Sequence, residues 1–421
     1  MDEESRRRKA IELLDQGVRP SEVLRRLERS RDWLSKWRRR FDELGAAGLV
    51  GRSHAPRHHP WTTSARVVRA IVAARERLER RARGRGFAGV GSDAVAWELE
   101  LARVRPLPSR RTIERVLARH GRTARVARPA PRPPAEPYPA PMARRPGDLQ
   151  QTDLVGPRHL RTPRGPEGFY SFHTVDVAGG GAASFQFPDK SGESFCRYLA
   201  EIAWPALGIP RIWQVDNESA LAGLPGQRHI FTQPVRLALL LGAEVRFIPE
   251  GEPGRNADVE SYNALWQARV LHRFDCPGLA RLARVSARFD RWYMEARPHP
   301  KLSVAQHGTR FPAALLASLD GALPRPPRRF SIDDHRGAQG EIRLPLARGR
   351  ISWVRRVDEH GRLRLIDQQL RLGRRAANQY VVATLSTGIG EIRVWLGTEI
   401  VSRFPFDAPE RVVHPLVRRG R

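Results

Sequence analysis

Apolar side chains recur every three or four positions in the first part of the chain. Residues 5–41 show this spacing most clearly at Trp33, Trp37 and Phe41, and it predicts three short helices. Only a tight turn separates the second helix from the third, as in a helix-turn-helix whose second helix enters the major groove of DNA. A plain three-helix bundle with a solvated basic face is the alternative interpretation.

The last of these helices carries several basic side chains, and we expect them to contact DNA. They are Arg31, Lys36, Arg38, Arg39 and Arg40. A second group of amphipathic, basic helices is predicted at residues 64–84, 92–102 and 108–121, and it has the form of a second helix-turn-helix. Its expected DNA contacts are Arg110, Arg111 and Arg115.

Serines stand at several of the expected helix starts, where a hydroxyl can accept a hydrogen bond from a free N–H of the first turn. The predicted N-caps are Ser21, Ser30, Ser92 and Ser109.

The hydrophobic pattern changes beyond a proline-rich stretch at residues 122–147, which is typical of a semi-rigid linker. Three successive strands are predicted first, followed by alternating helices and strands, and this order indicates a mixed α/β domain. The strands are expected at residues 149–156, 169–177, 181–188, 210–219 and 244–249. Short alternating runs between turns then predict a small all-β barrel or sandwich near the C-terminus.

The expected fold class is therefore multidomain, with all-α helix-turn-helix units, an α/β core and a small all-β barrel. The expected divisions are two helix-turn-helix domains at 1–58 and 59–121, a linker at 122–147, the core at 148–316, a linker at 317–339, the barrel at 340–406 and a basic tail at 407–421.

Net charge supports a polyanionic partner, most simply nucleic acid. The 421 residues include 74 basic and 45 acidic side chains, for a formal charge of +29. Only four of the basic residues are lysine, and a GC-rich genome also favours arginine. That compositional explanation does not account for the excess over carboxylates.

Other bulk features exclude whole classes of protein. The sequence has no run of about 18 apolar residues, so no transmembrane helix is expected. It has no visible apolar leader either, so we expect no secretion signal. Two cysteines, Cys196 and Cys276, cannot form a disulfide framework or a four-cysteine zinc site.

Three carboxylates in the α/β region are candidates for chemistry. Asp153 lies in the first strand, Asp216 ends a later strand, and Glu260 opens a helix after a Gly/Asn turn. A carboxylate among apolar strand residues is costly unless it is paired or bound to a cation. Oxygen ligands of this kind suit Mg²⁺ or Mn²⁺, and three of them can hold two ions for phosphoryl transfer. Each acid alone could equally be a strand end, an Asx turn or a helix first-turn residue.

Longer motifs around these acids resemble a known family. The segments "PGDLQQTDLVG", "QVDNES" and "PGRNADVESYNALW" resemble the three acid-bearing motifs of bacterial insertion-sequence transposases with a D-D-E integrase core. The segment "EARPHPKLSVAQHGTRFPAALL" resembles the motif that closes that core. The likeness covers nearly the whole chain and implies a ribonuclease-H-like catalytic domain.

The resemblance implies a polynucleotidyl transferase, which cuts DNA at the ends of a mobile element and joins the freed strand to target DNA. Asp153, Asp216 and Glu260 would be both the catalytic residues and the metal ligands, with Asn217, Asn263 and Asp176 as near-site candidates. The implied cofactor is Mg²⁺ or Mn²⁺, as two ions with DNA bound.

The implied partners are double-stranded DNA, both element ends and target, and further copies of the chain. An accessory ATPase is a further partner that such a system can require. No membrane is implied, and the expected location is the bacterial cytoplasm, in association with the nucleoid.

Several positions depart from the family pattern, among them the segment "DVAGGGAA", which begins at Asp176. Glu218 stands where a glycine usually follows Asn217, Ala257 replaces a glycine, and Asp258 occupies a position that is commonly basic. Two other interpretations therefore stay open. One is a catalytically weakened relative that serves as a DNA-binding or regulatory subunit, and the other is a metal-dependent nuclease without joining activity.

Overall fold

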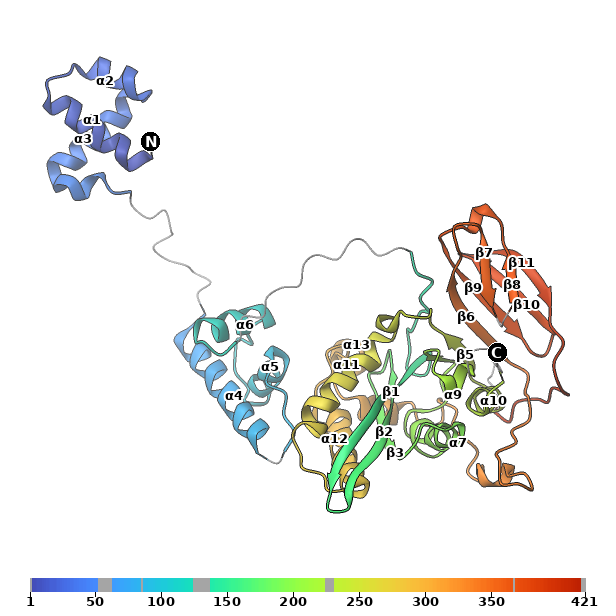
Figure 1. Cartoon of the computed structure of the whole chain (residues 1–421). Coiled ribbons are helices and arrows are strands. Elements are labelled where there is room, and N and C mark those ends of the chain that lie inside the picture. The colour runs from blue at the N-terminus through green and yellow to red at the C-terminus, as the bar shows by residue number, and fades with distance from the viewer. Residues whose placement is uncertain are drawn as a thin grey trace. The chain divides into compact units, whose positions relative to one another are not determined.

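The computed structural model describes residues 2–51, 63–84, 86–123, 137–223, 231–365 and 368–417 (Figure 1). Contacts group the chain into two compact units, Met1–Ser64 and Ala65–Arg421. Half of the expected linker, residues 124–136, lies outside the described residues. The finer divisions expected inside the second unit stay predictions. No helix in these ranges is long and apolar enough to cross a membrane.

The first unit contains three helices, as its hydrophobic spacing predicts. They are α1 (Glu3–Asp15), α2 (Pro20–Leu27) and α3 (Arg31–Leu44), followed by a 3-10 turn at Gly45–Leu49. Ser30 caps α3 as expected, because its hydroxyl accepts a 3.2 Å hydrogen bond from the N–H of Trp33. The Ser21 prediction is wrong. Helix α2 begins one residue earlier, at Pro20, whose fixed φ suits a first helical position.

The second unit begins with three more helices, α4 (Ala65–Arg83), α5 (Ser92–Leu101) and α6 (Arg110–Arg119). They enclose a small core of their own. Ser109 caps α6 as expected, at 3.2 Å from the N–H of Thr112. Ser92 does not cap α5, because the N-cap position falls on Gly91 and the Ser92 hydroxyl instead donates to Glu114 at 2.9 Å.

A mixed sheet forms the α/β core, as the alternating pattern predicts. Strands β1 (Leu149–Thr162), β2 (Gly165–Asp176) and β3 (Ala182–Phe187) are antiparallel. Strands β4 (Ile212–Val215) and β5 (Glu244–Phe247) run parallel to β1, in the order β3-β2-β1-β4-β5. Neighbouring parallel strands end at the same edge of a sheet, so residues that follow β4 lie beside residues of β1.

Helices cover both faces of this sheet (Figure 1). One apolar cluster joins the sheet to α7 (Gly192–Arg197), α8 (Trp204–Leu207), α9 (Ser219–Ala222) and α10 (Gln233–Leu240). The other joins it to α11 (Ala257–Trp266) and α12 (Leu279–Arg291). The short helices α13 (Val304–His307) and α14 (Pro312–Ser318) follow. Both faces are therefore buried, as expected for a sheet with parallel strands.

The C-terminal region is rich in strands, as expected, but the separate barrel is not confirmed. Strand β6 (Arg350–Arg356) pairs in parallel with β5, and β9 (Tyr380–Ser386), β10 (Glu391–Leu396) and β11 (Glu399–Pro405) extend one nine-stranded sheet. Strands β7 (Arg362–Leu365) and β8 (Gln368–Arg371) form a separate hairpin. Pairing with β6 satisfies the backbone of β5, which would otherwise be an open edge.

Candidate active site

Sheet register brings two of the predicted acids together. Gln151 of β1 pairs with Gln214 of β4, so Asp153 and Asp216 each stand two residues beyond the same pair. Both aspartates are half-buried. Glu260, also half-buried, lies on the first turns of α11.

Electrostatics show that these carboxylates act on one another. The pKa of Asp216 is raised to about 6, mainly by burial and also by the charge of Asp153. Burial also raises the pKa of Asp153, and Glu260 adds to that rise. The charge of Glu260 thus disfavours ionisation of Asp153, and the charge of Asp153 disfavours ionisation of Asp216.

Two buried glutamines hold the start of α11 against the strands. Gln151 accepts hydrogen bonds from the N–H groups of Asp258 at 3.1 Å and Val259 at 3.3 Å. Gln214 donates to the side-chain oxygen of Asn256 at 3.0 Å and to the carbonyl of Arg255 at 3.1 Å. These bonds satisfy free groups at the helix start. The helix bearing Glu260 is therefore tied to the strands that lead to Asp153 and Asp216.

The near-site candidates separate into different roles. Asn263 donates a 2.7 Å hydrogen bond to Asp153 and so lies at the site. Asn217 accepts from Arg355 of β6 and donates to the carbonyl of Ile248, both at 2.8 Å, which links the residue after Asp216 to the C-terminal strands.

Asp176 is not brought to the site. It pairs in register with Gln150, three residues before Asp153. Its carboxylate accepts from the N–H groups of Gly147 at 2.7 Å and Gly179 at 2.6 Å, and these bonds hold the turn after β2.

Lysines neutralise two of the departures from the family pattern. Lys190 donates to Glu218 at 2.8 Å, and Lys301 donates to Asp258. Burial alone would raise the pKa of Glu218, but the hydrogen bonds from Lys190 and Ser219 lower it. Neither pair was predicted from the sequence. The available signal was the rarity of lysine: only four of the 74 basic residues are lysine, and two of those four form these pairs.

The donor atoms of the site bear on whether it can hold a metal ion. Across the described ranges, no group of three or more His, Cys, Asp or Glu side chains is arranged to hold a metal ion. The chemistry of the donors nevertheless fits a hard cation, because Asp153 and Asp216 are half-buried oxygen donors that repel each other. A bound divalent ion would relieve this repulsion.

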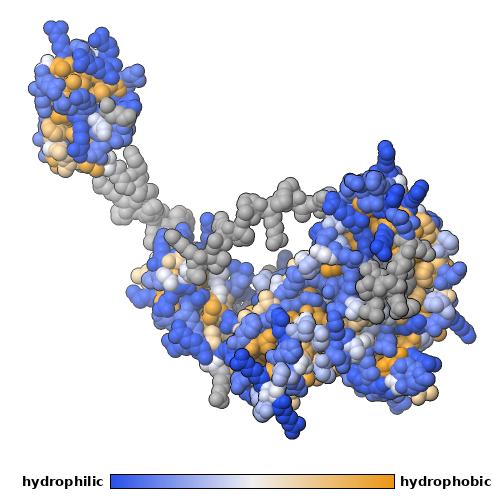
Figure 2. All heavy atoms as spheres, viewed as in Figure 1, coloured by the Kyte–Doolittle hydropathy of each residue, from blue (hydrophilic) through white to orange (hydrophobic). Residues whose placement is uncertain are grey.

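The expected DNA contacts are mostly exposed. The exposed members of the set expected on α3 are Arg31, Lys36, Arg38 and Arg39. Arg40 differs, because it is half-buried, stacks 4.6 Å from the Trp37 ring and donates to the Val50 carbonyl at 3.2 Å. Figure 2 shows a largely hydrophilic surface on the visible face of this unit.

On α6, the three expected contacts are also exposed. Arg111 and Arg115 lie on the surface of the helix, while Arg110 forms an ion pair with Asp93 of α5. The charge of Arg110 is thus partly neutralised by a carboxylate of the protein itself.

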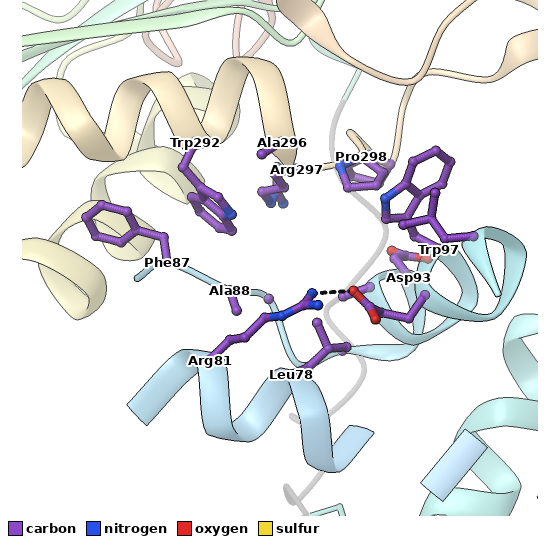
Figure 3. Close-up of a pocket in the computed structure, with 16 residues that line it drawn as sticks. Leu78, Arg81, Phe87, Ala88, Asp93, Trp97, Trp292, Ala296, Arg297 and Pro298 are labelled. Carbon is purple, nitrogen blue, oxygen red and sulfur yellow. Dashed lines mark hydrogen bonds and ion pairs between the residues drawn. The ribbon is translucent and has the colours of Figure 1, made fainter. Parts of the chain in front are cut away.

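A pocket of about 360 Å³ lies between helices α4 and α5 on one side and the segment that follows α12 on the other (Figure 3). Phe87 closes one side, 5.4 Å from the ring of Phe289 and 5.9 Å from that of Trp292. Arg81 pairs with Glu98 at 2.5 Å on the other side. None of the predicted acids lines this pocket, so it is a junction within the second unit, apart from the candidate active site.

Comparisons with known proteins give a family match at the N-terminus. Residues 7–67 match the model of the winged helix-turn helix family. A search of curated proteins finds no match.

The solved structures similar to this chain include the following three. A chain of the simian T-cell lymphotropic virus intasome, in complex with PP2A regulatory subunit B56 gamma, is 14% identical with a TM-score of 0.33; the match covers 76% of this chain and 99% of that one. The HTLV-2 integrase catalytic core with magnesium is 15% identical with a TM-score of 0.28, covering 39% and 98%. The BIV integrase catalytic core is 12% identical with a TM-score of 0.30, covering 42% and 97%. Similarities this low carry no argument about activity.

Proposed function

We propose that this chain is a DNA transposase or integrase that cuts DNA at element ends and joins the freed strand to target DNA. The supporting observation is the convergence of Asp153, Asp216 and Glu260, which come from neighbouring parallel strands and from a helix anchored to both. In this proposal the core is ribonuclease-H-like, and the three acids are its D-D-E set.

The acids would hold Mg²⁺ or Mn²⁺, which supplies charge stabilisation and an activated nucleophile when bound. Asn263 holds the Asp153 carboxylate in one orientation through its 2.7 Å hydrogen bond. Gln151 and Gln214 fix the approach of Glu260 to the strands. The chain itself therefore contributes position and charge, as expected for phosphoryl transfer.

DNA binding is assigned to the winged helix-turn-helix match and to the exposed basic residues of α3 and α6. The proposed partners are double-stranded DNA, at element ends and target, and further copies of the chain. The accessory ATPase stays a prediction from the family resemblance.

Charge pairing favours the active enzyme over a weakened relative. Glu218 and Asp258 motivated the weakened interpretation, yet each is paired with a lysine. The field at Asp153 and Asp216 is therefore less negative than the sequence alone indicates. Cutting without joining remains the second candidate function, because the same acids would serve hydrolysis.

A strand-transfer assay with Mg²⁺ and Mn²⁺ on DNA carrying the element ends tests the proposal. We expect the wild type to cut and join, and Glu260→Gln to do neither. Glu201→Gln, the same chemical change in an exposed surface ion pair, is the matched control and should retain activity. Cutting without joining would establish the nuclease. Normal DNA binding with neither reaction would establish the weakened relative.

A further inference from the structure

A line of four hydrogen bonds runs from the third strand of the core to Asp153. Gln186 donates to the hydroxyl of Ser171 at 2.9 Å, and this hydroxyl lies 2.7 Å from Nε2 of His173. Nδ1 of His173 lies 2.6 Å from Oδ1 of Asn263, whose amide nitrogen donates to Asp153 at 2.7 Å. The line thus crosses β3, β2, α11 and β1.

Register explains why these side chains meet. His173 is the direct partner of Asp153 across β1 and β2, and Ser171 is the partner of Gln186 across β2 and β3. Residues two apart on a strand share a face, so Ser171 and His173 point the same way. Asn263 then reaches that face from α11.

The four hydrogen bonds satisfy every donor and acceptor with only one assignment of the protons. An ionised carboxylate only accepts, so Asn263 must turn its NH₂ group to Asp153 and its oxygen to His173. A neutral imidazole has a single N–H, which must then lie on Nδ1. Nε2 therefore accepts from Ser171, whose oxygen accepts from Gln186.

The surroundings keep the ring neutral and still. His173 is fully buried, and burial lowers its pKa to about 4. Its ring packs 5.1 Å from that of Tyr262 and 4.9 Å from that of Trp266, both on α11. A satisfied core histidine that only packs is the simpler interpretation. It does not account for a line of bonds that ends on the Asp153 carboxylate.

We infer that His173, with Ser171 and Gln186 behind it, is a positioning residue that fixes the amide of Asn263 and thereby the orientation of Asp153. This inference rests on the proposed function. Loss of the His173 N–H would free the Asn263 amide to turn over and present its oxygen to the carboxylate. Mutation of a partner of this kind typically lowers activity or metal affinity about 10- to 100-fold.

The first test needs no activity. The ¹⁵N spectrum of histidine-labelled, full-length wild type should show His173 as a neutral ring protonated on Nδ1, with its signal assigned by its loss in His173→Leu. A ring protonated on Nε2 would overturn the inference, whether or not the chain cuts DNA. The outcome is therefore separate from that of the proposed function.

The second test compares three variants in cutting and joining. His173→Leu should lower kcat about 10- to 100-fold with little change in KM for DNA. His173→Asn, which keeps an N–H at the place of Nδ1, should recover most of this loss. Thr174→Val is the matched control: it removes the buried 2.8 Å bond between Thr174 and Thr152 on the same strand, outside the line. Equal losses of kcat in His173→Leu and Thr174→Val would reduce His173 to a structural role and overturn the inference.

Discussion

Two aspartates of the core, Asp176 and Asp216, share a pKa of about 6 but differ in surroundings. Burial raises both pKa values. Asp176 is fully buried and receives two backbone N–H groups, so its oxygens are satisfied within the turn that it holds. Asp216 is half-buried beside the charges of Asp153 and Glu218.

The difference teaches how to interpret a raised pKa. Donors around Asp176 offset part of the cost of burial, which is what a structural carboxylate requires. Around Asp216 the main neighbours are other carboxylates, which increase the cost. Such an arrangement is typical of a site whose compensation arrives with a ligand, here a cation in the proposed function.

The largest expected effect comes from Asp216→Asn. This variant tests whether the repulsion between Asp216 and Asp153 identifies a carboxylate needed for activity. Activity should fall by at least about 100-fold, because charge at the reacting centre is lost. Thermal stability should stay equal or rise, since the like charge beside Asp153 disappears and the amide oxygen can still accept from Glu218 N–H at 3.1 Å. Strand-transfer rates and melting temperatures of the same preparation check both parts. A less stable variant would contradict the comparison.

Asp176→Ala should show the reverse pattern. The N–H groups of Gly147 and Gly179 would lose their partner, at a cost of about 1–3 kcal/mol in the free energy of unfolding. Activity per folded molecule should change little, because Asp176 lies three register positions from Asp153. Denaturant unfolding and an activity assay well below the melting temperature measure these two quantities. A selective loss of activity would return Asp176 to the candidate site.

A smaller effect is expected from breaking the hydrogen bonds that Gln151 accepts from the start of α11. The neighbouring glutamine provides a matched control. Gln151→Leu should lower activity about 10-fold, since Asp258 and Val259 lose their acceptor at the start of the helix that carries Glu260. Gln150→Leu is the control. This neighbouring glutamine is equally buried but donates to the carbonyl of Gly208 at 2.9 Å, away from α11. Equal activities of the two variants would show that the anchor is not needed.

Sequence reasoning found what local pattern encodes. The strands of the core and the helices follow from apolar spacing. Asp153, Asp216 and Glu260 were predicted from their order along the chain and from the resemblance of the surrounding motifs to a known family. Asp176 was grouped with them as a near-site candidate through the same family resemblance. Spacing along the chain does not show that its donors come from Gly147 and Gly179.

The missed features depend on contacts between distant residues. Gln151 and Gln214 read as ordinary strand residues, and the role of His173 appears only when β1, β2 and α11 are packed together. The pairing of β5 with β6 was missed for the same reason: 104 positions separate Phe247 from Ile351, and alternation indicates strands without naming their partners.

The smallest expected effect concerns Asp290 of α12, a third carboxylate with a raised pKa. It extends the comparison of Asp176 with Asp216 to the pH dependence of stability. Its side chain is half-buried, accepts two 2.9 Å bonds from the backbone and hydroxyl of Ser184, and accepts another from Tyr262. Burial raises its pKa to about 7 from the usual 3.8. The folded state therefore holds this proton more tightly than the unfolded state. The resulting stabilisation is complete below pH 3.8 and is lost as the pH rises through about 7.

Asp290→Asn cannot titrate, so its melting temperature should fall less than that of the wild type between about pH 5 and pH 8. The amide oxygen can still accept from Ser184, and the Tyr262 hydroxyl can turn to accept from the new NH₂ group. His173 and His299, whose pKa values burial lowers to about 4, change stability in the opposite direction. Both histidines are present in the two proteins, so the difference between the two melting curves isolates Asp290. Parallel curves would mean that its bonds hold Asp290 ionised throughout, and that donors alone can cancel the effect of burial on a carboxyl pKa.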